Sequence, residues 1–215
     1  MDIIHFLLDF ILHLDKHLTD IVNQYGTLTY AILFLIVFVE TGLIIMPLLP
    51  GDSLLFAAGA LAAASGVLNI WILIPLLIIA ALLGDNVNYF VGKFLGTTIK
   101  KRERILFFKK EYVEQTEEYY AKYGGKTVII ARFIPIVRTI APFVAGAGSM
   151  AYSKYITYCV LGAILWVVGV SFIGYFFGNM PIVKQNFEIV IFGIIGVSVL
   201  PIIYGIAKNS MTKKS

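Results

Sequence analysis

Long apolar segments with almost no charge are the feature that most limits how this sequence can fold. Between residues 21 and 92 the only charged residues are Glu40, Asp52 and Asp85. Charged residues make up 14% of the chain and hydrophobic residues 59%, whereas soluble domains carry roughly 25% charged residues. A membrane-spanning helix needs about 20 apolar residues, so a chain of 215 residues holds only a handful of spans. The sequence therefore predicts an all-α, multi-pass membrane protein without a large soluble domain.

Apolar and polar segments follow one another in an order that predicts the topology. Polar residues recur at helical spacing near the N-terminus, which is typical of an amphipathic interfacial helix. Three to four apolar segments are long enough to span a bilayer. The predicted single membrane domain, 1–215, comprises an amphipathic helix 1–26, a re-entrant hairpin 28–66, a spanning helix 70–96, a cytoplasmic segment 100–126, a second re-entrant hairpin 127–150, spanning helices 152–178 and 186–207, and a cytoplasmic tail 208–215.

Helix-breaking residues interrupt both segments that we predict to be re-entrant. The first contains Pro47, Pro50 and Gly51, and the second contains Pro135. Two prolines within four residues cannot continue a helix, and the apolar piece after Gly51 is too short to span a bilayer comfortably. Broken backbone at membrane depth is tolerated where protein buries it or where it lines a cavity. Both segments are therefore interpreted as helical hairpins that enter and leave the membrane on the same side.

Clustered charge supports this topology. Nearly half of the thirty charged residues lie between Lys93 and Lys126, and the tail 208–215 has three lysines and no acid. The positive-inside rule places both segments in the cytoplasm, and the net charge of +4 is explained by them rather than by nucleic-acid binding. An amphipathic helix, a broken hairpin and a long helix then occur twice, in residues 1–96 and 104–178. Charge parity predicts that these repeats are inverted, with the two hairpins opposed.

Four charged residues flank the two helix breaks, and they are the candidate site. They are Glu40, Asp52, Arg132 and Arg138. A charge in the bilayer interior costs at least a few kcal/mol, so these residues need partners, a ligand or water. One interpretation is that ion pairs merely hold two hairpins in register. The other is a transport site, because paired helix breaks with charged residues are typical of transporters.

The identity of the basic residues indicates the chemistry of the ligand. The guanidinium groups of Arg132 and Arg138 match the oxygens of a phosphate bidentately and do not readily lose a proton. We therefore predict a phosphate-bearing ligand, and protonation of Glu40 or Asp52 would couple its binding to a proton gradient. Asp85 and Asn88 add a polar face to an apolar helix. They either fasten helices by hydrogen bonds or line the transport pathway.

Enzymatic chemistry has no candidate residues in this sequence. Residues 124–127 resemble the end of a phosphate-binding loop but lack its earlier glycine. Every histidine lies within the first 17 residues, and Cys159, the single cysteine, is interpreted as inert packing without neighbouring ligands. We therefore expect a protein that is not an enzyme and that binds neither a metal ion nor a cofactor.

Several of these segments together resemble the bacterial DedA family, within the SNARE-associated Golgi protein or VTT-domain superfamily. The resemblance covers about residues 1–207 and is specific as a set of motifs. The motifs are FVETG at 38–42, PLLPGDS at 47–53, GDNVNY at 84–89, and ARFIPIVR at 131–138 followed by Ala145-Gly146.

This resemblance implies a bacterial inner-membrane protein with two opposed re-entrant hairpins. It also implies that the positions of Glu40, Asp52, Arg132 and Arg138 are functionally essential, and that the protein translocates lipids. Related members are linked to undecaprenyl phosphate, and others to phosphatidylethanolamine or to scrambling of glycerophospholipids. The resemblance further implies that the protein depends on the proton motive force. It also implies roles in membrane homeostasis, cell division and resistance to cationic antimicrobials.

The leading hypothesis is a lipid flippase that moves undecaprenyl phosphate across the inner membrane without ATP, with proton coupling as a further step. Its expected partners are membrane phospholipids, a polyprenyl phosphate and protons. Alternatives are a phosphatidylethanolamine flippase or scramblase, a proton-coupled cation exporter, and a structural protein that recruits envelope partners through residues 93–126. Two glycine pairs with a spacing of four residues, Gly92 with Gly96 and Gly174 with Gly178, allow helices to approach closely. We interpret them as packing contacts within one chain, with a homo-oligomer as the alternative.

Overall fold

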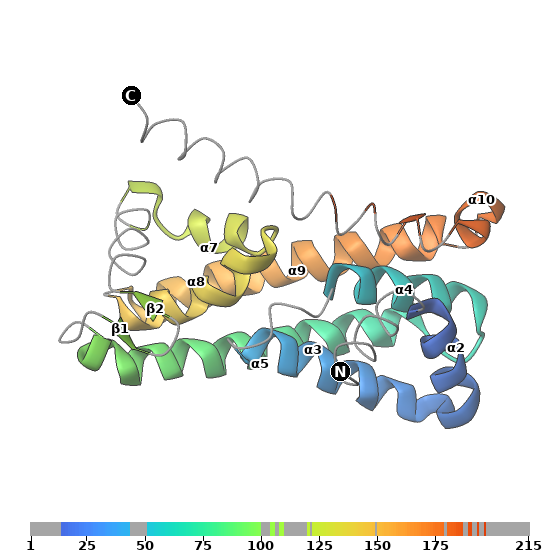
Figure 1. Cartoon of the computed structure of the whole chain (residues 1–215), viewed down its shortest axis with the longest axis horizontal. Coiled ribbons are helices and arrows are strands. Elements are labelled where there is room, and N and C mark those ends of the chain that lie inside the picture. The colour runs from blue at the N-terminus through green and yellow to red at the C-terminus, as the bar shows by residue number, and fades with distance from the viewer. Residues whose placement is uncertain are drawn as a thin grey trace. The chain divides into compact units, whose positions relative to one another are not determined.

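The residues that the structure describes are almost all helical (Figure 1). The computed structural model describes residues 14–43, 51–99, 104–105, 108–109, 120, 122–148, 150–178, 180–186, 189–190, 193 and 196. Its elements are α2 (Leu14–Tyr25), the 3-10 helix η1 (Gly26–Leu28), α3 (Thr29–Gly42), α4 (Gly51–Ala64), α5 (Ile70–Ile99), β1 (Arg104–Ile105), β2 (Phe108–Lys109), α7 (Lys126–Ala131), α8 (Pro135–Ala147), α9 (Tyr152–Phe177) and α10 (Pro181–Gln185).

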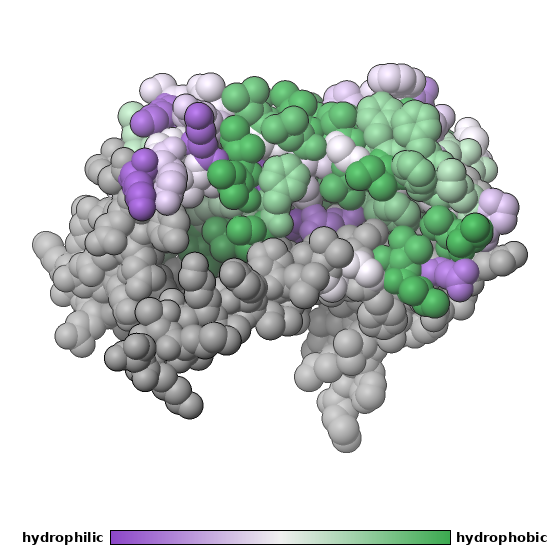
Figure 2. Space-filling model, turned by 90° about the horizontal axis from the view of Figure 1, so that it is seen from above, coloured by the Kyte–Doolittle hydropathy of each residue, from purple (hydrophilic) through white to green (hydrophobic). Residues whose placement is uncertain are grey.

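Long apolar helices make this a membrane protein. Among the described residues, three helical stretches are long and apolar enough to cross a bilayer: His17–Gly42, Ile70–Leu95 and Tyr152–Phe177. Many large hydrophobic side chains on these helices are exposed, including Phe94 and Phe176, and Figure 2 shows hydrophobic residues covering much of the described surface on one face. Such a surface is stable against lipid and unfavourable against water.

Two of the predicted apolar segments coincide with long helices. The predicted span 70–96 lies within α5, and the predicted span 152–178 corresponds to α9. The predicted end of the N-terminal amphipathic helix, near Gly26, coincides with the point where α2 gives way to η1, and Gly26 has a positive φ of 53°. Glycine adopts this conformation without steric cost. Residues 1–13, most of the predicted helix 186–207 and the tail 208–215 lie outside the described residues.

The charged segment 100–126 contains one element that departs from the all-α prediction. Strands β1 and β2 pair antiparallel, with Arg104 opposite Lys109 and Ile105 opposite Phe108. Two residues per strand are too few to show an alternating pattern in a sequence, so this small hairpin gives no signal there. Most of the predicted helical stretch 111–122 lies outside the described residues.

The described contacts divide the chain into two units. Unit 1 comprises residues 1–32, 48–74 and 167–215, and unit 2 comprises residues 33–47 and 75–166. Because α3, α5 and α9 each continue from one unit into the other, both units are built from parts of the same long helices.

In unit 1, the short helix α4 packs backbone to backbone against the C-terminal part of α9. A Cβ atom at Gly174 would clash with the carbonyl oxygen of Phe56, and one at Gly59 would clash with the carbonyl oxygen of Ser171. Small residues allow such close approach between membrane helices. Glycine at these two positions is therefore what permits the contact.

In unit 2, the short helix α8 packs in the same way against the C-terminal part of α5. A Cβ atom at Gly92 would clash with the carbonyl oxygen of Phe143, and one at Gly146 would clash with the carbonyl oxygen of Tyr89. The short helix contributes a Phe and, three residues later, a Gly, as α4 does in unit 1. The two units thus contain equivalent helix contacts made by matching residues.

Candidate functional site

A helix break in unit 2 positions the two arginines. Helix α7 ends at Ala131, and the backbone N–H of Arg132 closes its last turn on the carbonyl oxygen of Ile129 at 3.2 Å. Pro135 then begins α8, where its fixed φ suits a first helical position and its missing N–H is not needed. Arg138 lies in the first turn of α8. The break thus places one arginine on each side of a turn.

Close contact between α3 and α5 positions the two facing carboxylates. A Cβ atom at Gly84 would clash with Oγ1 of Thr41, and one at Gly42 would lie 3.2 Å from Cα of Gly84. Because both positions are glycine, the last turn of α3, which carries Glu40, can lie directly against the part of α5 that carries Asp85.

Each arginine is paired with one of these carboxylates. Arg132 donates a hydrogen bond from Nη2 to Oδ2 of Asp85, and Arg138 donates one from Nη2 to Oε1 of Glu40. All four residues are buried, with relative exposures of 1% for Glu40, 3% for Asp85, 5% for Arg132 and 9% for Arg138. Two positive and two negative charges therefore balance inside the protein, as buried charges require.

One face of α9 completes the charged cluster. Trp166 is 1% exposed, and its ring lies under both guanidinium groups, with Cζ of Arg138 4.9 Å and Cζ of Arg132 5.7 Å from the ring centroid. The Cys159 thiol donates to Oδ2 of Asp85 at 3.3 Å and lies 3.5 Å from Nη2 of Arg132. The sequence interprets Cys159 as inert packing, whereas the fold brings its thiol to both members of an ion pair.

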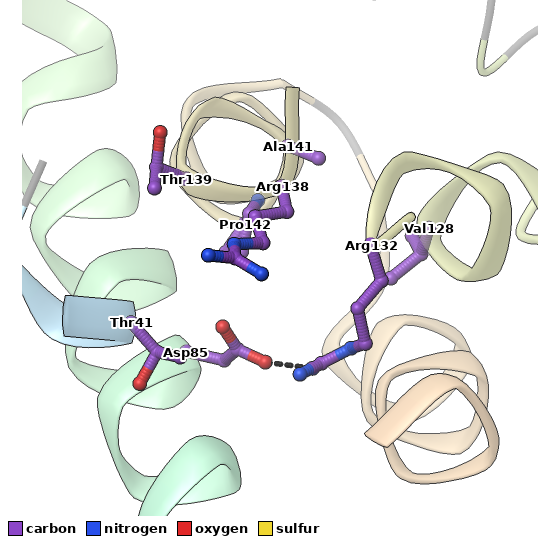
Figure 3. A pocket seen from close by; sticks show the side chains of 8 residues that line it. All are labelled: Thr41, Asp85, Val128, Arg132, Arg138, Thr139, Ala141 and Pro142. Atoms are coloured by element: carbon purple, nitrogen blue, oxygen red, sulfur yellow. Dashed lines mark hydrogen bonds and ion pairs between the residues drawn. The ribbon is translucent and has the colours of Figure 1, made fainter. Parts of the chain in front are cut away.

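A small cavity lies between these groups. Its lining residues are Thr41, Asp85, Val128, Arg132, Arg138, Thr139, Ala141 and Pro142. Figure 3 shows the Arg138 side chain and the Asp85 carboxyl group directed into one space, with Arg132 reaching the carboxyl group from the other side. Only about 10 Å³ is open to the centre of a water molecule, which is room for about one water. In this conformation the site is closed to a group as large as phosphate.

Hydrogen bonds to backbone carbonyls support the cavity wall. Nδ2 of Asn88 donates to the carbonyl oxygen of Thr139 at 2.7 Å and to that of Thr41 at 3.4 Å. Asn88 thus fastens α8 and the end of α3 to α5. The hydroxyl of Tyr120 donates to the carbonyl oxygen of Ala141 at 2.8 Å. Burial raises the pKa of Tyr120 above its usual value, so the phenol remains protonated and able to donate.

Of the remaining predicted site residues, the structure describes Asp52 and Gly51. Asp52 belongs to unit 1, where it is half-buried in the first turn of α4; a carboxylate there is favoured by the helix dipole. Gly51 begins this helix and is buried. Pro47 and Pro50 lie outside the described residues.

Two residues of the charged cluster have no role in the site that the sequence predicts. Trp166 is absent from that site, and Cys159 is interpreted there as inert packing. On α9, Cys159 lies four residues after Tyr155, and Trp166 lies seven residues after Cys159. All three side chains are buried. Residues with these intervals share one face of a helix. In the sequence this face is visible only as the spacing of these three residues within an apolar segment. Its contact with the arginines could not be predicted, because the arginines belong to other helices.

Comparison with known proteins identifies the family. The VTT domain matches residues 49–176. Protein DedA of Escherichia coli strain K12 is 52% identical over 94% of this chain and 92% of its own length. An uncharacterised membrane protein of Mycobacterium leprae is 45% identical over 84% of this chain and 82% of its length.

A more distant relative is the inner membrane protein YqjA of Escherichia coli strain K12, which is 31% identical over 83% of this chain and 80% of its own length. No solved structure matches the chain. The family match includes Asp85, Arg132, Arg138 and Trp166 and begins after Glu40. Protein DedA aligns over 94% of the chain. This protein is therefore a member of the DedA family of VTT-domain membrane proteins.

Proposed function

We propose that this protein moves a lipid with a phosphate headgroup, and specifically undecaprenyl phosphate, between the leaflets of the bacterial inner membrane. The observation that carries the proposal is the pair of buried arginines, Arg132 and Arg138, beside one cavity at a helix break. Guanidinium groups donate hydrogen bonds to the oxygens of an anion and have no acceptor atom to offer a cation. This chemistry argues against the cation exporter, and it needs neither a catalytic group nor a cofactor.

The proposed mechanism exchanges one anion for another. In the closed conformation the carboxylates of Asp85 and Glu40 occupy donors of the two arginines. A lipid phosphate that enters an opened site takes their place, because its oxygens match the same guanidinium donors. Protonation of Glu40 or Asp85 removes a competing negative charge and so favours the lipid, which couples binding to the proton gradient. For Asp52, which lies in the first turn of α4 after the first helix break, proton coupling or gating is proposed from its position in the sequence alone.

The proposed architecture is that of two opposed re-entrant hairpins in inverted repeats. The matching contacts of α4 with α9 and of α8 with α5 support it, because each repeat then contributes a Phe and a Gly from its short helix and a close-packed Gly from its long helix. The break before Pro135 supports a hairpin tip at membrane depth.

Reconstitution in liposomes tests the proposal. The wild type is expected to move labelled undecaprenyl phosphate faster than undecaprenol, which has the same tail and no phosphate, and faster than phosphatidylethanolamine. The double variant Glu40→Gln with Arg138→Gln removes the ion pair without leaving one charge alone, and it should lose most of this activity. Lys154→Gln, which removes an exposed charge of α9, is the matched control.

The outcomes separate the alternatives. Equal rates for the wild type and the double variant would exclude the arginine site as the transport site. Preferential movement of phosphatidylethanolamine would assign the phospholipid flippase or scramblase instead. Absence of any lipid movement by folded wild-type protein would favour the structural role.

A further inference from the structure

We propose that Trp166 is a positioning residue that holds Arg132 and Arg138 as one anion-binding unit when their carboxylate partners are displaced. The inference rests on the proposed function and assigns a role to a residue on α9 that contacts both arginines. It follows from three features of the site: the different origins of the two arginines, the separate carboxylate partners, and the shared aromatic ring.

The two arginines come from different helices, and each donates a hydrogen bond to a different carboxylate. Arg132 caps α7 and pairs with Asp85 of α5, whereas Arg138 belongs to α8 and pairs with Glu40 of α3. When a ligand displaces either carboxylate, the released guanidinium loses the partner that fixed its position.

An indole ring offsets this loss without competing for the ligand. The face of an aromatic ring attracts a cation through its quadrupole, and tryptophan is the strongest of the three aromatic residues in this respect. It accepts no hydrogen bond from the guanidinium edge, so the N–H donors remain available to phosphate oxygens. A carboxylate would instead occupy those donors.

The surroundings of Trp166 suit this role. The side chain is 1% exposed and lies on the same α9 face as Cys159 and Tyr155, which contact Asp85. A buried ring in a long, continuous helix is a rigid support. Both guanidinium groups lie within 6 Å of its centroid, which is the range of cation–π attraction.

Binding measurements on full-length protein in detergent test the inference. Undecaprenyl phosphate is titrated by calorimetry into the wild type, Trp166→Phe, Trp166→Leu and, as matched control, Trp71→Leu. Trp71 is the other tryptophan of the chain; it is 72% exposed and lies in unit 1. We expect the Kd to rise about threefold for Trp166→Phe and about tenfold for Trp166→Leu, and to stay unchanged for Trp71→Leu.

A spectroscopic readout distinguishes positioning from simple packing. In a Trp71→Phe background Trp166 is the only tryptophan, and undecaprenyl phosphate should shift its fluorescence whereas undecaprenol should not. An unchanged Kd in folded Trp166→Leu would overturn the inference. If that variant does not fold, an unchanged Kd in Trp166→Phe, or an unchanged fluorescence of Trp166, would do so.

The proposed function and this inference fail in different ways. Wild-type protein that binds undecaprenyl phosphate no better than undecaprenol would remove the proposed function, and the inference with it. Selective binding by the wild type that is equally strong in both Trp166 variants would remove only the inference.

Discussion

Arg132 at the end of α7 and Asp85 in α5 form a buried ion pair although 47 positions separate them in the sequence. The pair joins a helix break to a continuous membrane helix and forms part of the cavity wall. It also places Asp85, for which the sequence leaves a packing role and a pathway role open, in the centre of the arginine site.

Removing one member of this pair should destabilise the protein more than removing both. Asp85→Leu leaves Arg132 buried without its carboxylate, at an expected cost of about 3–5 kcal/mol. The double variant Asp85→Leu with Arg132→Met leaves no charge alone and should recover at least half of the lost stability. Thermal unfolding in detergent, followed by circular dichroism, measures both. A double variant that is as unstable as the single one would contradict this reasoning.

A positive charge at position 138 should not be sufficient for tight binding of the lipid phosphate. Arg138→Lys keeps a positive charge opposite Glu40, so it should destabilise the protein less than loss of the charge, which costs about 3–5 kcal/mol in a buried pair. Binding of undecaprenyl phosphate should nevertheless weaken about tenfold, because an ammonium group lacks the planar fork. Calorimetric titration measures this difference, and Lys154→Arg on the exposed face of α9 is the control. Binding that stays as tight as in the wild type would argue against bidentate recognition.

Replacing a glycine at one of the close helix contacts with alanine should destabilise the protein. Gly92→Ala and Gly174→Ala each place a Cβ against a backbone carbonyl of a short helix, and each should cost about 1–3 kcal/mol. A Cβ atom at Gly169 would meet no described atom within 4 Å, so Gly169→Ala should be neutral or stabilise α9 by up to about 1 kcal/mol. Melting temperatures of the three variants compare them directly. Equal values for Gly92→Ala and Gly169→Ala would show that the close packing is relaxed in solution.

The single cysteine offers a direct measure of how closed the site is. Because Cys159 is buried beside the ion pair, maleimide should label it roughly a hundredfold or more slowly in native protein than in SDS-denatured protein. Asp85→Leu removes one hydrogen-bond partner of the thiol and loosens the cluster, so labelling should become faster. Mass spectrometry at timed intervals follows the reaction. Rapid labelling of the native wild type would mean that the site is open.

Local properties make the long helices and the charged residues predictable. Continuous apolar segments as long as α5 and α9 have one stable arrangement in lipid, namely a helix that satisfies its own backbone hydrogen bonds. Pro135 marks the start of α8 for an equally local reason, because proline fixes φ and lacks an N–H. The strands β1 and β2 escape prediction because their pairing involves only two residues each.

Residue types and their order are enough to establish a helical membrane protein in which Glu40, Arg132 and Arg138 are too costly to bury alone. Which carboxylate meets which arginine depends on the fold, since Glu40 and Arg138 are 98 positions apart. The fold also brings Trp166 and Cys159 to the same cluster. Burial cost is a property of one residue and its neighbours in the chain, whereas pairing depends on how closely separate helices approach. Here that approach is set by backbone contacts at residues such as Gly84 and Gly92.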